Sequence, residues 1–220
     1  MADASHELKT PLTVILSNAQ LLREAEADPE LHGRLTENIL SMSARMRSLV
    51  ESLLELARVD SGLTGQTLSR VELSRVVSEA LLPFEPLFYE RGLTLSSSIE
   101  PDIAVKGSAE RLSQAVGVLL DNAQKYASPG GNVLVTLSRQ GRRHCLLAVE
   151  NSGEPLSPAE RRDIFKRFYR ADAARSSGGS YGLGLSIARG IVEAHRGRIW
   201  AEAVPGGNRF CIRLPVQKSK

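Results

Sequence analysis

The stretches SHELKTPLTVILSNAQLLRE (residues 5–24) and PELHGRLTENILSMSARMRSLVESLLELARVD (residues 29–60) decide the fold. Apolar residues recur in each at alternating intervals of four and three, which is the heptad pattern of helices that pack together. They are Leu8, Leu12, Ile15, Ala19 and Leu22, followed by Leu35, Ile39, Met42, Met46, Leu49, Leu53 and Leu56. The Asp28-Pro29 step disfavours helix at its first residue and favours a helix start at its second, so the sequence predicts a helical hairpin.

A hairpin with an apolar stripe along each helix cannot bury both stripes by itself. Dimerisation into a four-helix bundle is the usual solution, and we expect a homodimer formed through residues 1–60. The alternative, in which the two helices pack on the rest of the chain, stays open.

A linker is expected after the hairpin, because the stretch DSGLTGQTLS at residues 60–69 combines glycines with small polar residues. We therefore divide the chain into a hairpin at 1–60, a linker at 61–68 and a second domain at 69–220. Periodicity in the second domain predicts helices near 74–90, 108–127, 158–166 and 183–195, and strands near 93–99, 103–106, 133–137 and 145–149, with a final strand pair around 205–208. These elements predict an α+β fold, one largely antiparallel sheet under one helical layer.

Composition and charge narrow the class of ligand. Of 220 residues, 42% are hydrophobic, as in an ordinary globular protein. Residues 1–60 carry 6 Lys and Arg against 10 Asp and Glu, whereas residues 61–220 carry 22 against 15. The basic excess favours a small anionic ligand, and its scattered placement, with only 5% aromatic residues, argues against nucleic acid. Cys145 and Cys211 lie in alternating apolar runs and are expected to be reduced core residues.

No membrane-spanning segment is expected, because the sequence contains no run of about 18 apolar residues. The N-terminus also lacks the basic segment followed by an apolar one that marks a secretion signal. We therefore expect this segment to make no membrane contact. Met1 directly precedes a run that reads as mid-helix, so we also expect an upstream region before it.

His6 is the first candidate for chemistry. It lies two residues before Leu8, about 200° round the helix, and should face solvent. Lys9 and Thr10 share its face, and the neighbouring Glu7 could orient the imidazole. A nucleophilic imidazole needs a neutral ring nitrogen, a carboxylate partner and open access. A lone histidine is more often structural, and this alternative stays open at the level of the residues.

Asn122 is the second candidate, because it falls on the apolar stripe of the helix near 108–127. A carboxamide there needs a partner, either an ordinary hydrogen bond or a hard cation. Lys125 projects near the same edge and could meet phosphate.

A glycine-rich loop, GGSYGLGLS at residues 178–186, directly precedes a predicted helix. Glycines let backbone N–H groups approach phosphate oxygens, and the helix N-terminus favours the charge, although flexible connectors look similar. A second turn, at residues 151–155, offers Asn151 as a contact for a purine edge.

Five motifs together resemble the H, N, G1, F and G2 boxes of bacterial sensor histidine kinases. They are SHELKTPLT (5–13), LLDNAQKY (119–126), ENSGEP (150–155), FKRFYR (165–170) and GLGLSIA (182–188). The resemblance implies a dimeric histidine-phosphotransfer hairpin joined to an ATP-binding α/β sandwich of the gyrase, Hsp90, histidine kinase and MutL type. It also implies ATP-dependent phosphorylation of a histidine and transfer of the phosphoryl group to an aspartate of a response regulator receiver domain.

Residue by residue, the resemblance implies that His6 is the phosphoacceptor, Glu7 its acidic partner and Thr10 a residue that supports dephosphorylation of the response regulator. Asn122 matches the Mg²⁺ ligand. The implied nucleotide contacts are Asn122, Lys125, Tyr126, Asn151, Gly153, Arg170, Gly182, Leu183, Gly184 and Leu185. Residues 171–181 resemble a lid over ATP, with Phe165 and Phe168 as anchoring core.

This chain departs from the family pattern at three positions: Val118 stands where asparagine is usual, Asn151 where aspartate is usual, and Pro155 at the second glycine of the G1 box. An asparagine can still accept a hydrogen bond from the adenine amine, but without the help of a charge. We expect ATP binding to survive in weaker form. Two alternatives stay open: a non-catalytic phosphotransfer or scaffold module with a degenerate nucleotide-binding domain, and an ATPase of the same fold.

The resemblance also bears on location. It implies that this segment is cytoplasmic and that the full-length protein belongs to the bacterial cell membrane.

Overall fold

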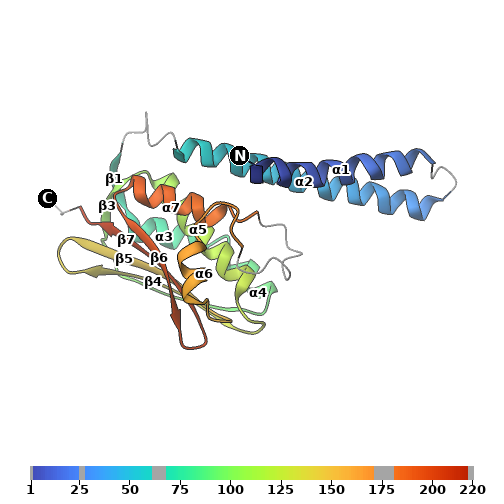
Figure 1. Cartoon of the computed structure of the whole chain (residues 1–220). Helices are drawn as coiled ribbons and strands as arrows, with labels where there is room; N and C mark the ends of the chain where they lie inside the picture. The colour runs from blue at the N-terminus through green and yellow to red at the C-terminus, as the bar shows by residue number, and fades with distance from the viewer. Residues whose placement is uncertain (1, 25–27, 61–67, 171–180, 218–220) are drawn as a thin grey trace.

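A computed structural model describes residues 2–24, 28–60, 68–170 and 181–217. Its first part is a long hairpin of two antiparallel helices, α1 (Ala2–Glu24) and α2 (Pro29–Asp60), which Figure 1 shows extending away from the rest of the chain. The Asp28 carboxylate accepts hydrogen bonds from the backbone N–H groups of Glu30 and Leu31, both at 3.1 Å, and so caps α2. The predicted hairpin and the start of its second helix at Pro29 are confirmed.

The second domain contains two sheets and five helices within its described residues. The strands are β1 (Ser69–Glu72), β2 (Thr94–Ile99), β3 (Ala104–Gly107), β4 (Asn132–Gln140), β5 (His144–Ser152), β6 (Arg198–Val204) and β7 (Gly207–Pro215). The helices are α3 (Leu73–Leu81), α4 (Glu85–Glu90), α5 (Ala109–Tyr126), α6 (Pro158–Asp163) and α7 (Gly184–Ala194).

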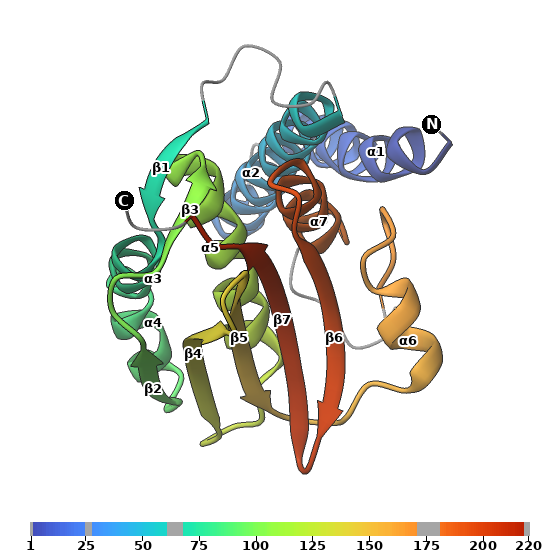
Figure 2. The same cartoon turned by 90° about the vertical axis from the view of Figure 1, so that its left-hand side faces the viewer.

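The main sheet has the strand order β2-β4-β5-β7-β6, and only the β2–β4 pair is parallel. Its inward-facing residues alternate along the strands and share one apolar core with α3, α5 and α7. In Figures 1 and 2 these helices lie on one face of the sheet, with α7 between the sheet and the hairpin. The predicted α+β fold with one helical layer is confirmed.

Two details of the prediction were wrong. The helix expected near 74–90 is broken into α3 and α4, because Pro83 cannot donate a backbone hydrogen bond and residues 82–84 form a turn. A second, two-stranded sheet also forms, in which β1 pairs antiparallel with β3. The run that makes β1 is too short to stand out from the predicted linker, of which residues 61–67 lie outside the described residues.

The hairpin packs on the second domain as well as on itself. Leu49 and Leu56 of α2 are buried in the same core as the second domain, and Leu53 and Val59 pack against it. The alternative left open by the sequence therefore holds for the C-terminal half of α2. A further set of apolar side chains on the hairpin remains exposed, among them Leu16 (57%) and Leu40 (65%).

Candidate functional site

The His6 side chain is exposed on the first turns of α1, as the sequence predicted. Glu7, Lys9 and Thr10 are exposed beside it. The Thr10 hydroxyl donates a hydrogen bond to the His6 backbone carbonyl at 3.3 Å, one helical turn away. An electrophile from solvent or from a neighbouring domain can therefore reach the imidazole.

The C-terminal turns of α5 carry the next group of predicted residues. Asn122 is half-buried, and its carboxamide makes no hydrogen bond within the part of the chain that the structure describes. Lys125, by contrast, is paired with Asp121 one turn earlier, at 2.5 Å between Nζ and the carboxylate. The amide oxygen of Asn122 is thus available to a ligand, whereas the Lys125 ammonium already has a carboxylate partner.

The start of α7 lies against the face of α5 that carries Val118 and Asn122. A Cβ on Gly184, the first residue of α7, would lie 3.4 Å from Val118 Cγ1, and Asn122 is one turn further along α5 from Val118. Val118, where the family has asparagine, therefore fills the contact between the two helices. Leu183 provides no side-chain cap, so the first N–H groups of α7 lack a capping side chain. Asn122 and these N–H groups form one end of the site.

Gly182 fixes the glycine loop to the F-box stretch. It has a φ of +68°, and a Cβ there would lie 2.5 Å from the Tyr169 carbonyl oxygen. Its own carbonyl accepts a hydrogen bond from the Phe168 N–H at 3.0 Å. Only glycine fits this close approach with a positive φ.

The remaining predicted residues of this region can be placed only in part. The Leu183 side chain is buried in the core, and Leu185 and Arg170 are partly buried. Residues 171–180 of the predicted lid lie outside the described residues. A nucleotide contact by Leu183 can therefore come only from its backbone.

The other end of the site is formed by the G1 turn. Gly153 has a φ of +153°, and a Cβ on it would lie 2.8 Å from the carbonyl oxygen of Tyr126, the last residue of α5. The glycine thus brings the end of β5 against the end of α5. Pro155 lies exposed beyond this turn, so its replacement of a glycine causes no crowding.

Asn151 is the residue whose geometry points most directly to a ligand. Its side chain is 1% exposed, and its Nδ2 group donates to the Ser152 carbonyl at 3.0 Å. Its Oδ1 atom is buried without any hydrogen-bond partner in the described structure. Buried acceptors are nearly always paired, so this oxygen is suited to an N–H donor from a ligand, such as the exocyclic amine of adenine. The residues present therefore fit a nucleotide.

Sequence reasoning missed Asn208, which supports Asn151 from the neighbouring strand. The two residues are cross-strand partners. The buried Asn208 side chain donates to the Glu154 carbonyl and accepts from the Leu156 N–H, both at 2.8 Å. These bonds hold the turn that follows Asn151. The GGN run at 206–208 signalled only a hairpin turn, and no local pattern could show what the asparagine bonds.

His195, at the C-terminal end of α7, is a buried histidine that no sequence motif singles out. It is 3% exposed, with Nδ1 bonded to the Ile191 carbonyl at 2.7 Å and Nε2 accepting from the Ser108 N–H at 3.0 Å. Burial lowers the pKa of this imidazole, and the bond to Ile191 offsets the effect only in part. His195 joins the end of α7 to the start of α5 and has a structural role.

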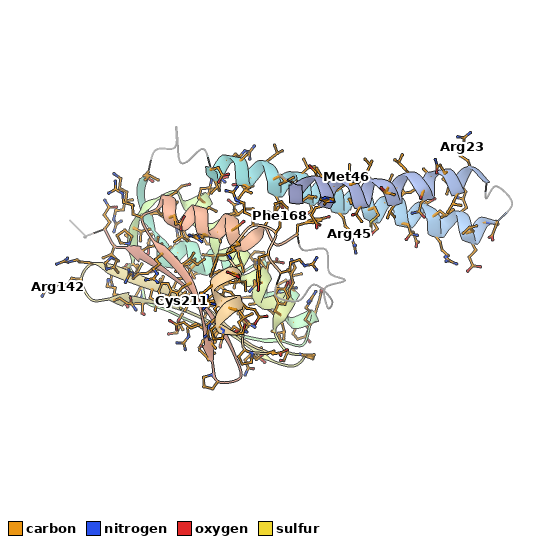
Figure 3. All side chains as sticks on the ribbon, in the orientation of Figure 1. Arg23, Arg45, Met46, Arg142, Phe168 and Cys211 are labelled. Carbon is orange, nitrogen blue, oxygen red and sulfur yellow. The ribbon has the colours of Figure 1, made fainter. Side chains whose placement is uncertain are left out.

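Tyr181, directly before Gly182, connects the site to the hairpin. Its hydroxyl donates to the backbone carbonyl of Arg45 in α2 at 2.9 Å. Figure 3 labels Arg45 on the side of α2 that faces the second domain. Burial raises the pKa of Tyr181, Arg45 lowers it and the Glu7 carboxylate raises it, so Glu7 lies within electrostatic range. The glycine-loop end of the site is therefore tied to α2 at Arg45, and Figure 1 shows the start of α1 alongside α2.

Two protein families match separate parts of the chain. Residues 1–62 match the "His Kinase A (phospho-acceptor) domain", and residues 107–218 match the "Histidine kinase-, DNA gyrase B-, and HSP90-like ATPase". Within the described residues, no helix is long and apolar enough to cross a membrane.

Two curated relatives extend over nearly the whole chain. Sensor protein DltS of Streptococcus agalactiae serotype III (strain NEM316) is 35% identical over 98% of this chain and 53% of its own length. The histidine-protein kinase/phosphatase MprB of Mycolicibacterium smegmatis (strain ATCC 700084 / mc(2)155) is 38% identical over 94% of this chain and 42% of its own length. The chain thus spans about half the length of the curated relatives it matches.

A solved structure shows the same fold. Histidine kinase ThkA, in complex with response regulator protein TrrA, aligns with a TM-score of 0.78 at 22% identity, over 98% of this chain and 60% of that one.

Proposed function

This chain belongs to the histidine kinase family, and we propose that it phosphorylates His6 from ATP and passes the phosphoryl group to an aspartate of a response regulator. The observation that supports this proposal best is the 2.9 Å hydrogen bond from Tyr181 to Arg45, because it holds the glycine-loop end of the ATP-binding domain against the helix that pairs with α1, on which the exposed His6 lies. The family match to a histidine kinase-like ATPase supports ATP as the donor.

The nucleotide would lie along α5. The buried Asn151 Oδ1 atom accepts a hydrogen bond from the adenine amine at one end. At the other end, the first N–H groups of α7 face the phosphates, with Gly182 and Gly184 allowing close approach. Asn122 would hold Mg²⁺ through its amide oxygen, and the bound ion offsets phosphate charge.

In the transfer step, the neutral ring nitrogen of His6 forms a bond to the γ-phosphorus while the bond from that phosphorus to the bridging oxygen of ADP breaks. Glu7 accepts or stabilises the proton on the other ring nitrogen. Positioning and charge stabilisation do most of the catalysis in phosphoryl transfer, so the protein needs no further covalent group. The products are phosphohistidine and ADP.

Incubation with γ-labelled ATP and Mg²⁺ tests this proposal. We expect label on the wild-type chain and on His32→Ala, a control at an exposed histidine of α2, and none on His6→Ala. Equal labelling of His6→Ala would remove His6 from its role. Calorimetric titration with ATP tests the scaffold alternative, which predicts no binding heat.

The exposed Thr10 hydroxyl is proposed to support dephosphorylation of the response regulator, as the kinase/phosphatase name of MprB suggests for that relative. Thr10→Ala should slow phosphate release from a phosphorylated receiver about tenfold. Thr13→Ala is the matched control, because Thr13 makes the same kind of bond to the carbonyl one turn earlier. Equal slowing in both variants would point to a change in helix stability instead.

The assembly that we propose is a homodimer through the exposed apolar face of the hairpin, with the receiver docked on the same bundle. We also propose that the segment is the cytoplasmic part of a membrane-anchored sensor. The longer relatives that are named sensor proteins support this assignment.

A further inference from the structure

A buried ion pair joins the hairpin to the second domain of the same chain. Glu55 of α2 pairs with Arg111 in the first turn of α5, and each side chain is 14% exposed. Gln114 also accepts a hydrogen bond from the Arg111 guanidinium at 3.1 Å. A pair this far from water is screened little, and removing one partner leaves the other buried and uncompensated. The contact is therefore specific to one docking position.

Close helix packing fixes the same position. A Cβ on Gly190 of α7 would overlap the Val59 side chain of α2, so the glycine lets the two helices approach. Leu49 and Leu56 extend this apolar contact into the core. The more exposed pair of Asp60 and Arg167, at 2.6 Å, adds little in water.

The docked position of the ATP-binding domain determines which part of the hairpin its nucleotide site faces. About three turns of α2 separate Glu55 from Arg45, whose backbone carbonyl accepts the hydrogen bond from the Tyr181 hydroxyl. Tyr181 is also within electrostatic range of Glu7, the neighbour of His6. The phosphate end of the nucleotide site thus points to the His6 turn of its own hairpin. The contacts that fix this docked position, from Glu55 to Arg111 and from Tyr181 to Arg45, are all made within one chain.

We propose that the ATP-binding domain phosphorylates the His6 of its own chain, and that Glu55 and Arg111 are positioning residues for this transfer. The inference rests on the proposed kinase function. It assigns the substrate of each ATP-binding domain within the dimer.

Heterodimers purified through two different tags test the assignment. One heterodimer combines a wild-type chain with a chain carrying both His6→Ala and Asn122→Ala. Transfer within one chain labels its wild-type subunit, whereas transfer between chains leaves it unlabelled.

A second heterodimer combines His6→Ala in one chain with Asn122→Ala in the other. Here transfer within a chain gives no label, and transfer between chains labels the Asn122→Ala subunit. The opposite pattern in both heterodimers overturns the inference. An unlabelled wild-type homodimer would instead contradict the proposed function itself.

The positioning role has its own readout. Arg111→Met should lower the rate constant of autophosphorylation about tenfold and leave the KM for ATP unchanged, because the ATP contacts lie elsewhere on α5 and α7. Arg189→Met is the matched control, since Arg189 pairs with Glu193 within α7. Adding Glu55→Gln to Arg111→Met should lower the rate constant little further, because the two substitutions remove the same interaction. A faster reaction in Arg111→Met would show that docking restrains transfer and would contradict the proposal.

Discussion

The hairpin and the second domain satisfy their apolar residues in different ways. The second domain encloses a core of its own between sheet and helices, in which residues such as Leu119 and Leu120 are fully buried. The hairpin buries part of its apolar surface on that domain through α2 and leaves another part exposed. A domain with a closed core is stabilised by its own packing, whereas a helix pair with two apolar surfaces is stabilised by the domains or chains that it contacts. His6, the proposed phosphoacceptor, lies on the hairpin, the part of the molecule that is held by its contacts.

The largest effect should come from breaking the closed core. Leu119→Ala on α5 removes a fully buried side chain, so we expect the second domain to lose about 3 kcal/mol of its free energy of unfolding. Chemical denaturation of the variant measures this loss. Leu54→Ala on α2 is the control, because its side chain is 57% exposed, and an equal loss there would contradict the contrast between the two regions.

The exposed hairpin face should show the opposite behaviour. Replacing Leu16 and Leu40 by Ser removes apolar surface that is exposed in one chain and available to a second copy. We expect the dimer dissociation constant to rise about a hundredfold, while unfolding of the second domain stays unchanged. Analytical ultracentrifugation measures the change in association. Unaltered dimerisation would mean that another surface joins the copies.

Substitution of Asn151 tests whether its buried, unpaired Oδ1 atom serves ligand binding rather than the stability of the second domain. Asn151→Ala removes the unpaired Oδ1 atom, so ATP affinity should fall about tenfold while the free energy of unfolding changes by no more than about 1 kcal/mol. Calorimetry and denaturation measure the two quantities. Asn208→Ala should differ, because it removes two bonds that hold the turn and should also destabilise the domain. Unchanged ATP affinity in Asn151→Ala would place the adenine elsewhere.

The smallest effect concerns His195 and pH. The folded state keeps this imidazole neutral with a pKa below the ordinary value of 6.5, so the unfolded chain binds the extra proton first as the pH falls. Stability of the second domain should therefore decrease as the pH drops below about 6.5. Thermal melts from about pH 7.5 down to about pH 5 measure how the melting temperature changes with pH on both sides of the ordinary histidine pKa. The slope should remain in the control His144→Gln and flatten in His195→Gln, and a slope unchanged in both would exclude His195 as its source.

Sequence reasoning succeeded where the pattern was local and repeated. Heptad spacing and the Asp28-Pro29 step predicted the hairpin, and alternation predicted the strands of the main sheet. It failed where contacts between residues distant in the chain determine the structure. The pairing of β1 with β3, the docking of α2 on α7 and the bonds of Asn208 all depend on residues distant in the chain.

The same distinction applies to the candidate site. The exposure of His6 followed from its angle relative to Leu8, because that is a property of one helix. The pairing of Lys125 with Asp121 could have been anticipated from their spacing of four. The unpaired oxygen of Asn151 could not, because its burial requires β4, β5 and β7 together.

Mapping the phosphoryl group tests the central claim most directly. The wild-type chain is incubated with ATP and Mg²⁺, digested under alkaline conditions that preserve phosphohistidine, and sequenced by mass spectrometry. The account predicts phosphorylation of the peptide that contains His6, in proportion to time. A phosphoryl group on another peptide, or none while ATP binds, would contradict it.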